Sequence, residues 1–258
     1  MVRIAQISDL HVHESRAKRV RDFDDALREC ICAVNACSPD LVIATGDLTQ
    51  TGSEEEYRRL RELMGTLSAP YYVTPGNHDD PVALRRVFGD HRYLFQAANH
   101  CSYAVDLNDL RLVVLDSMKR GRAGGYMDAS RLAWLESQLD ATQQPVILAL
   151  HHPPFTTGVW PMDWLGFTHL RELERIVRAN PQIRRVVSGH VHSVRTGTWA
   201  GTFACTAPST RSQRLLIGAG WRIPAPFTAR PGFLLHTRDG AGISTELRRF
   251  DGSIEPLQ

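Results

Sequence analysis

The sequence lacks the features that mark several specialised classes of protein. It contains no apolar run long enough to cross a bilayer, which excludes a membrane-spanning helix. Its net charge of +2 at pH 7 is too small to indicate a nucleic acid or an anionic membrane as a partner. No apolar stretch of the signal-peptide type precedes Asp9, because the chain enters its first expected strand almost at once. We therefore expect a soluble, cytoplasmic protein.

The cysteines are few and form no recognisable metal or disulfide motif. Cys30, Cys32 and Cys37 lie along one expected helix without C-x-x-C spacing, and Cys101 and Cys205 are isolated. This pattern favours buried, reduced thiols over a disulfide framework or a zinc knuckle.

What the sequence does contain is an alternation of strand and helix patterns. With 258 residues, 43% of them hydrophobic, the chain can bury a large core. Aliphatic runs predict strands at residues 4–7, 41–45, 71–73, 146–150 and 185–188, and a hairpin turn at Asn108-Asp109 joins 102–107 to 111–115. Helical periodicity covers 24–36, 54–67, 81–88, 129–139 and 168–179, with Ser53 and Asp128 as expected N-caps. Short strands follow at 194–199, 202–206, 232–238 and 243–250. The order of elements predicts an α/β fold.

Five short polar clusters directly follow expected strands. They are Asp9-Leu10-His11, Gly46-Asp47, Gly76-Asn77-His78-Asp79, His151-His152-Pro153 and Gly189-His190-Val191-His192. Parallel strands bring their carboxyl ends to one edge of a sheet, where ligands bind, so we expect these clusters to meet. Imidazole together with carboxylate suits Zn, Fe, Mn or Co rather than Ca. Asp9-Leu10-His11 and Gly46-Asp47 alone are common by chance, whereas Gly189-His190-Val191-His192 is moderately specific and Gly76-Asn77-His78-Asp79 is a strong signal. All five in order predict a site for two metal ions.

This ordered set resembles the calcineurin-like metallophosphoesterases over residues 1–200. The short chain, Asn77-His78-Asp79-Asp80 and His151-His152-Pro153-Pro154 are similar to the bacterial class III cyclic-nucleotide phosphodiesterases and the glycerophosphodiesterases. The resemblance implies a four-layer αββα sandwich, with two mixed sheets flanked by helices. It also implies a catalytic domain at 1–200, while 201–258 would complete the sandwich and supply a cap or dimerisation segment.

The resemblance also implies which residues bind metal. The first ion would be held by Asp9, His11, Asp47 and His192. The second would be held by Asp47, Asn77, His151 and His190, with Asp47 bridging the two ions. The cofactor would be two divalent ions, and the ligands leave open whether they are Fe, Mn, Zn or Co.

The implied reaction is hydrolysis of a small phosphodiester, either 3′,5′-cyclic AMP or a glycerophosphodiester, by a hydroxide that bridges the metals. His78 would be catalytic at the leaving-group side, with Asp79 holding its ring, and Asn77, His78 and His192 would contact the substrate. The alternatives are a phosphomonoesterase, a nuclease or a phosphonate-ester hydrolase of the same superfamily, or a non-catalytic scaffold. No nucleic-acid partner is expected.

Three further features have two interpretations each. His152 either supports the neighbouring ligand or packs against Pro153. The side chains of Phe155, Trp160, Met162 and Trp164 either stack on a nucleobase or close a core. The segment 208–231 is a lid over the site or a contact between copies. Its apolar residues, which are Leu215, Leu216, Ile217, Trp221, Ile223 and Phe227, favour a homodimer over a loop folded onto its own core.

Overall fold

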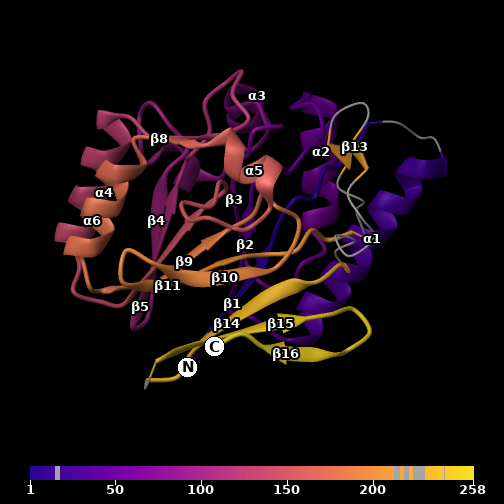
Figure 1. Cartoon of the computed structure of the whole chain (residues 1–258). Coiled ribbons are helices and arrows are strands. Elements are labelled where there is room, and N and C mark those ends of the chain that lie inside the picture. Colours follow the sequence, from indigo (N-terminus) through magenta and orange to yellow (C-terminus); the bar gives the residue numbers. More distant parts are fainter. Residues whose placement is uncertain (15–17, 212–215, 218–220, 223–229, 241) are drawn as a thin grey trace.

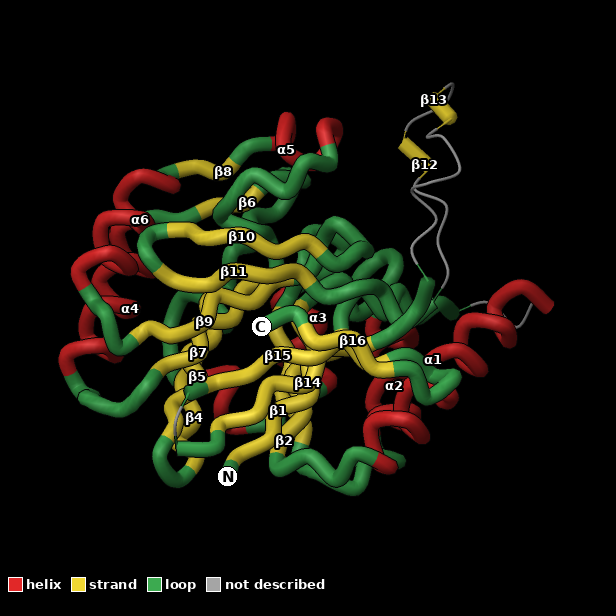
Figure 2. Tube along the Cα trace, turned by 60° about the horizontal axis from the view of Figure 1, so that its bottom comes forward, coloured by secondary structure: helices red, strands yellow, loops and turns green. Residues whose placement is uncertain are grey.

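Two six-stranded sheets lie face to face in the computed structural model, and helices cover their outer faces (Figure 1). The structure describes every residue except 15–17, 212–215, 218–220, 223–229 and 241. Helices α4 (Ala129–Asp140) and α6 (Leu170–Ala179) lie on one side, and α1 (Lys18–Ala36) and α2 (Glu54–Met64) on the other (Figure 2). The expected four-layer sandwich of two mixed sheets is confirmed.

The first sheet supplies three of the loops that carry polar clusters. Its strands β1 (Val2–Ile7), β2 (Leu41–Thr45) and β3 (Tyr71–Thr74) are parallel, so their carboxyl ends share one edge. Antiparallel strands then widen the sheet: β14 (Phe233–Arg238) pairs with β1, followed by β15 (Ile243–Arg248) and β16 (Ile254–Pro256). The C-terminal strands therefore complete the sheet in which the chain begins.

The second sheet supplies the other two loops. Strands β5 (Leu110–Leu115), β7 (Val146–Leu150), β9 (Ile183–Ser188) and β11 (Thr202–Thr206) are parallel, with β4 (Tyr103–Leu107) and β10 (Arg195–Trp199) antiparallel at the edges. Asn108 takes the left-handed conformation, with φ of 47°, in the predicted β4–β5 turn. Residue 200 lies in the turn between the paired strands β10 and β11, so the expected division at this position falls within one hairpin.

The predicted helix caps form, with one difference. Ser53 Oγ accepts from the Glu56 backbone N–H at the start of α2, and Asp128 caps α4 in the same way by accepting from Arg131. The Glu56 carboxylate, however, accepts from Thr51 instead of closing a capping box. Helix α2 ends at Met64, earlier than residue 67, and α3 (Pro81–Val87) agrees with the expected short helix.

Several very short elements were not predicted, because two or three residues have no measurable periodicity. Residue 168, expected in a helix, instead pairs in strand β8 (Phe167–Thr168) with β6 (Gly125–Tyr126). The other unpredicted elements are the helix α5 (Trp160–Leu165), the 3₁₀ turn η1 (Arg92–Phe95), and the strands β12 (Leu216–Ile217), β13 (Trp221–Arg222) and β16.

Three of the five cysteines are buried, as the sequence predicts, and two are not. Cys30, Cys101 and Cys205 are buried as expected, whereas Cys32 is exposed and Cys37 half-buried because they lie on other faces of α1 and its C-terminal turn. All five are free thiols. Among the described residues, we find no helix with the length and apolar character needed to cross a membrane.

A buried polar network joins the two sheets. The Gln6 amide donates to Thr45 Oγ1 and to the Ser188 carbonyl of the second sheet, both at 2.9 Å. Its oxygen lies 3.1 Å from His236 Nε2, and His236 Nδ1 lies 3.0 Å from Thr245 Oγ1. Burial, with a smaller contribution from Arg185, lowers the pKa of His236 to about 3. His236 is therefore a neutral imidazole that accepts from Thr245 and donates to Gln6.

We expect this histidine to make stability depend on pH. An unfolded histidine has a pKa near 6.5, so between that pH and about pH 3 the unfolded chain binds a proton that the folded chain does not. Lowering the pH through this window should therefore reduce the free energy of unfolding, by up to about 1.4 kcal/mol per pH unit from His236. Urea unfolding at pH 7 and pH 5 should give a smaller difference for His236→Gln than for the exposed control His169→Gln. Equal differences would show that His236 does not carry the effect.

Candidate metal centre

The structure brings seven predicted ligands together at the carboxyl ends of five strands. Four of them, Asp9, His11, Asp47 and His192, form one group whose candidate ligand atoms all lie within 4.8 Å of one another. These residues come from the loops after β1, β2 and β9, so the convergence follows from the parallel strands. Within the group, His11 Nε2 lies 3.2 Å from His192 Nε2, and His192 Nε2 lies 3.3 Å from Asp9 Oδ1.

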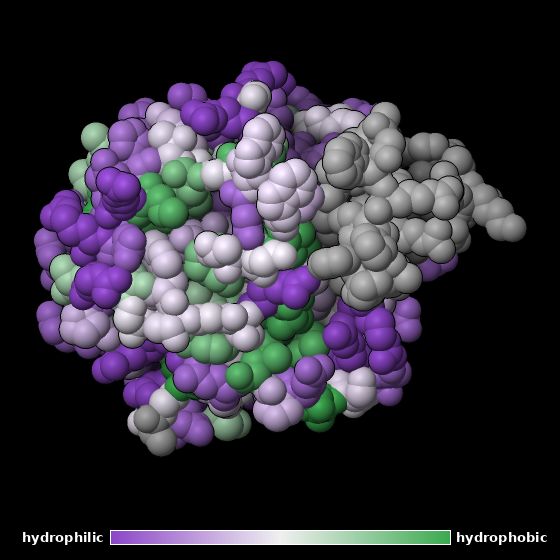
Figure 3. All heavy atoms as spheres, in the orientation of Figure 1, coloured by the Kyte–Doolittle hydropathy of each residue, from purple (hydrophilic) through white to green (hydrophobic). Residues whose placement is uncertain are grey.

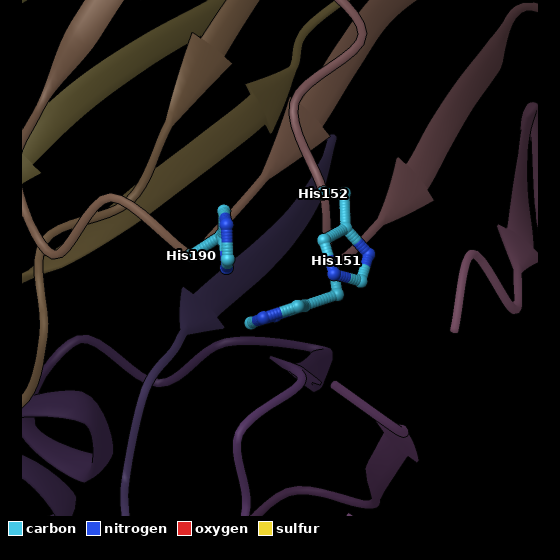
Figure 4. Close-up of side chains that lie close together, drawn as sticks. All are labelled: His151, His152 and His190. Atoms are coloured by element: carbon cyan, nitrogen blue, oxygen red, sulfur yellow. The ribbon is translucent and has the colours of Figure 1, made fainter. Parts of the chain in front are cut away.

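The second group is built around His151 and His190. Their rings are 5.1 Å apart between centroids and come from the ends of β7 and β9 (Figure 4). His151 Nδ1 donates to the Thr45 carbonyl at 2.8 Å, which turns Nε2 towards Asn77 Oδ1 at 3.3 Å. A backbone carbonyl that fixes the tautomer of a ligand histidine in this way is common in metal sites.

Asp47 lies between the two groups. Its Oδ2 is 3.6 Å from His11 Nε2, and its Oδ1 is 3.4 Å from His151 Nε2. The two oxygens therefore face different histidines, as a carboxylate shared by two cations would.

Most of the ligands have protonation states that suit cation binding. Burial lowers the pKa of both His11 and His190 to about 3, so both rings present lone pairs at neutral pH. Burial opposes ionisation of Asp47, but His151 and His11 outweigh it and hold the pKa of Asp47 well below its usual range. His192 similarly outweighs burial and lowers the pKa of Asp9. The exception is His151: burial opposes its protonation, but Asp47 outweighs burial and raises the pKa of His151 to about 9, so a cation would displace a proton from this ring.

The spacing of these atoms also fits a metal. Ligand atoms bonded to one ion at roughly 2.0–2.2 Å stand roughly 3.0–3.5 Å apart. The separations of 3.3 to 3.6 Å between histidine nitrogens and carboxylate oxygens, and of 3.2 Å between His11 Nε2 and His192 Nε2, are close to that spacing. The residues present therefore fit two divalent ions.

The backbone is strained at the predicted ligands. Asp9, His11, Asp47, His190 and His192 all have positive φ, between 45° and 71°. Such conformations are uncommon for residues with a Cβ and cluster at functional sites, where the surrounding structure stabilises them. Here the Asp9 carboxylate accepts from the His190 backbone N–H at 3.1 Å, and Ser209 Oγ donates to the Asp9 carbonyl at 2.8 Å. Ser209 was not predicted, because nothing distinguishes it within a Ser- and Pro-rich stretch.

Gly76 allows the two groups to approach each other. A Cβ at this position would collide with the backbone and carboxylate of Asp47 and with His151 Nε2. Gly76→Ala should therefore displace Asp47 and weaken metal binding by roughly 10–100-fold, the usual effect of disturbing a ligand's support. Metal content after dialysis at graded metal concentrations measures this. Gly242→Ala, where a Cβ meets nothing within 4 Å, is the matched control. Unchanged affinity in Gly76→Ala would contradict this account of the turn.

His78 lies beside the first group and is half-buried, so one side of it remains open. Its ring packs edge-on against His11, with centroids 4.8 Å apart, and its Nδ1 donates to the Gln50 carbonyl at 3.0 Å. This leaves Nε2 free to face a substrate. The backbone N–H of His78 donates to Asp47 Oδ1 at 3.0 Å.

The expectation that Asp79 holds the His78 ring is wrong, because the Gln50 backbone carbonyl is the group that accepts from the ring. The Asp79 carboxylate accepts instead from the backbone N–H groups of Leu48, Thr49 and Gly76 and from the hydroxyls of Thr49 and Tyr57, at 2.8 to 3.1 Å. Five donors leave it no capacity to orient the imidazole. Asp79 thus connects the Asp47 loop to the Gly76 turn, and burial raises its pKa to about 6.

His152 packs against the second group. Its ring centroid is 4.7 Å from that of His190 (Figure 4). Ser117 Oγ lies 2.9 Å from its Nδ1. Ser117 Oγ also accepts from the His152 backbone N–H, so its own proton points to Nδ1. Of the two interpretations, support of the neighbouring ligands agrees better with these contacts. Ser117 was not predicted, since it follows β5 without a motif.

The aromatic segment divides into two parts. Phe155 and Met162 line a cavity beside His152 and His190. Trp160 and Trp164 project from α5 into solvent, with 70% and 79% of their surface exposed. The segment therefore matches neither interpretation in full, because two of its residues line the cavity and two are exposed to solvent.

Comparisons with known proteins agree with this geometry. The family model for calcineurin-like phosphoesterases matches residues 2–194. A probable glycerophosphodiester phosphodiesterase of Arcobacter nitrofigilis is 36% identical, covering 81% of this chain and 79% of its own. A probable cyclic nucleotide phosphodiesterase of Synechococcus is 32% identical, covering 85% of both.

Among solved structures, a dimetal phosphatase from Danio rerio superposes with a TM-score of 0.71 over 100% of this chain and 99% of that one, at 13% identity. At that identity the likeness shows the fold alone. The family model and both relatives, by contrast, span most of the sequence. The chain belongs to the calcineurin-like phosphoesterase family.

Proposed function

We propose that this protein is a metal-dependent phosphodiesterase that hydrolyses small phosphodiesters. The observation that carries the proposal is the place of Asp47, whose two oxygens face His11 on one side and His151 on the other. Asp9, His11, Asp47 and His192 would hold the first ion, and Asp47, Asn77, His151 and His190 the second. When bound, two such ions lower the pKa of a water nucleophile and polarise the phosphoryl oxygens. Fe, Mn, Zn and Co are all compatible with these ligands.

The chain's own residues would complete the reaction. Five of the ligands, Asp9, His11, Asp47, His151 and His190, are buried, whereas Asn77, His78 and His192 are half-buried. These three are therefore the residues best placed to contact the substrate. His78, with Nδ1 bonded to Gln50, would present Nε2–H to the departing alkoxide as a general acid.

The leading substrates are 3′,5′-cyclic AMP and glycerophosphodiesters, because the two relatives carry the names of a cyclic nucleotide phosphodiesterase and a glycerophosphodiester phosphodiesterase. A non-catalytic scaffold is disfavoured, since every ligand and His78 are present. The test is a panel on metal-reconstituted protein: cAMP, cGMP, 2′,3′-cyclic nucleotides, glycerophosphocholine, and p-nitrophenyl mono- and diesters. Faster hydrolysis of diesters than of monoesters supports the proposal, and a preference for monoesters would contradict it.

The homodimer is also part of the proposal. Strands β12 and β13 pair with each other, and Figure 2 shows this pair projecting from the body of the molecule. An isolated two-stranded ribbon is marginally stable in water, so a second copy that covers it would stabilise it. Of the apolar residues that suggested the contact, Leu215, Ile223 and Phe227 lie outside the described residues.

Trp221→Glu should therefore shift the molar mass measured by light scattering from dimer to monomer at micromolar concentration. A wild type that is already monomeric at this concentration would end the dimer proposal. A cytoplasmic location is proposed as well, supported by the five free thiols, which suit a reducing compartment.

A further inference from the structure

A cavity of about 230 Å³ lies directly beside the second metal group. Its lining includes His190 and His152, so a molecule inside it would touch a predicted ligand. The walls come from the loop after β7, from α5, from the β6–β8 pair and from β10. In Figure 3 this face is hollowed between α5 and β10, and hydrophobic side chains gather in the hollow.

Aromatic and apolar side chains form half of the lining. Phe155, Phe167 and Trp199 line the cavity together with Met162 and Leu170, and all five are half-buried. Gly124 and Gly125 also line the cavity. A Cβ on Gly125 would collide with the Phe167 ring, so the glycine allows that ring to lie against the backbone. Such walls favour a flat or apolar group.

The cavity carries little charge. None of the described residues that line it is lysine or arginine. Its carboxylate, Asp163, accepts from Thr157 N–H and Oγ1 and from Gly158 N–H at 2.7 to 2.9 Å, which ties it to its own loop. A second anionic group on the substrate would therefore find no cationic side chain among these residues.

The cavity and His78 lie at different ends of the site. His78 packs on His11, at the first group, whereas the cavity borders His190, at the second, and Asp47 lies between the two groups. In an acyclic diester, the leaving group that takes a proton from His78 is therefore not the group that enters the cavity. Pockets that enclose a whole drug-sized ligand usually measure roughly 300–1,000 Å³, so a volume of about 230 Å³ suits one substituent.

We propose that this cavity binds the retained ester group of the phosphodiester, and that it selects a neutral aromatic or apolar group. The inference rests on the proposed phosphodiesterase function. It predicts that the chain discriminates between diesters by the ester that stays on phosphorus. Diesters with an aromatic retained group are then better substrates than those with a small one.

Three p-nitrophenyl diesters that share one leaving group test the proposal: the methyl, benzyl and choline esters of p-nitrophenyl phosphate. Because p-nitrophenolate leaves from each, the difference in kcat/KM reports the retained group. The benzyl ester should exceed the methyl ester by roughly tenfold or more, the usual effect of filling an apolar pocket. The choline ester distinguishes a neutral pocket from an aromatic cage for cations.

Phe155→Ala should remove most of the benzyl preference, measured as the ratio of kcat/KM for the benzyl ester to kcat/KM for the methyl ester. Phe155→Leu, which keeps an apolar side chain, should lose less. Trp164→Ala is the matched control, because Trp164 is an aromatic residue of the same segment that does not line the cavity. Metal content and melting temperature of each variant show whether it is folded and loaded.

Equal rates for the benzyl and methyl esters in the wild type would overturn the inference while leaving the phosphodiesterase intact. Preference for the choline ester would overturn it too, by showing a cation site. A benzyl preference that survives in Phe155→Ala but is lost in Trp164→Ala would place the subsite elsewhere and so contradict it. If none of the three esters is hydrolysed, the proposed function itself fails.

Discussion

Replacing Asp47 with alanine should remove both metal ions and abolish hydrolysis. Its carboxylate faces His11 through Oδ2 and His151 through Oδ1, so its loss takes a ligand from each ion. The carboxylate would also offset the repulsion between the two cations, and the alanine variant lacks that negative charge. The loss of activity should exceed by far the roughly 10–100-fold cost of disturbing an outer partner of a metal ligand. Elemental analysis of the purified variant measures the metal directly.

The control for this variant is Asp106→Asn, which changes an exposed carboxylate at a sheet edge. It should retain its metals and its rate. The metal content and rate of Asp47→Asn should lie between those of Asp47→Ala and Asp106→Asn, because an amide keeps one oxygen but carries no charge. Two tightly held ions per chain in Asp47→Ala would show that Asp47 does not bridge them.

His78→Ala should keep its metals and lose roughly 10²–10⁴-fold in kcat on substrates with a poor leaving group. His78 packs on His11, but its Nδ1 is bonded to the Gln50 carbonyl and its Nε2 is free. If it donates a proton to the departing alkoxide, the loss should shrink for bis(p-nitrophenyl) phosphate, since p-nitrophenolate scarcely needs a proton. The exposed His169, replaced by Asn, serves as the control.

Two results would contradict this role for His78. An equal loss on alkyl and p-nitrophenyl esters would indicate that it stabilises the phosphoryl oxygens instead. Loss of a metal ion from His78→Ala would indicate that it supports the ligands and not the leaving group.

The positions of the ligands could be predicted from the sequence because each follows a strand with a clear apolar pattern. The residues after β2 and β7, Asp47 and His151, meet since parallel strands end at one edge. Asn77 and His190 follow from the same rule. What positions these side chains could not be predicted in the same way.

The partner of His78 is the clearest case. The Gln50 carbonyl orients its ring, and a backbone carbonyl leaves no signature in a sequence. Asp79, the adjacent carboxylate, was the natural candidate, but five donors from the surrounding loops take up its oxygens.

The cavity beside His190 could not be predicted from the sequence for another reason. Its walls come from five separate parts of the chain, including β6, β8 and α5, which are too short to show periodicity. The sequence indicates that the aromatic segment after His151 could contact a substrate. The fold is needed to show that Phe155 and Met162 line the cavity while Trp160 and Trp164 lie outside it.

The most direct test of the two-metal phosphodiesterase is a titration of metal-stripped protein. Hydrolysis of bis(p-nitrophenyl) phosphate would be followed as Mn²⁺, Co²⁺, Zn²⁺ or Fe²⁺ is added in known molar ratio to the chain. With two groups of ligands joined by Asp47, the rate should be negligible without metal and should rise until two equivalents are bound. Full activity in the stripped protein, or saturation at a single equivalent, would contradict it.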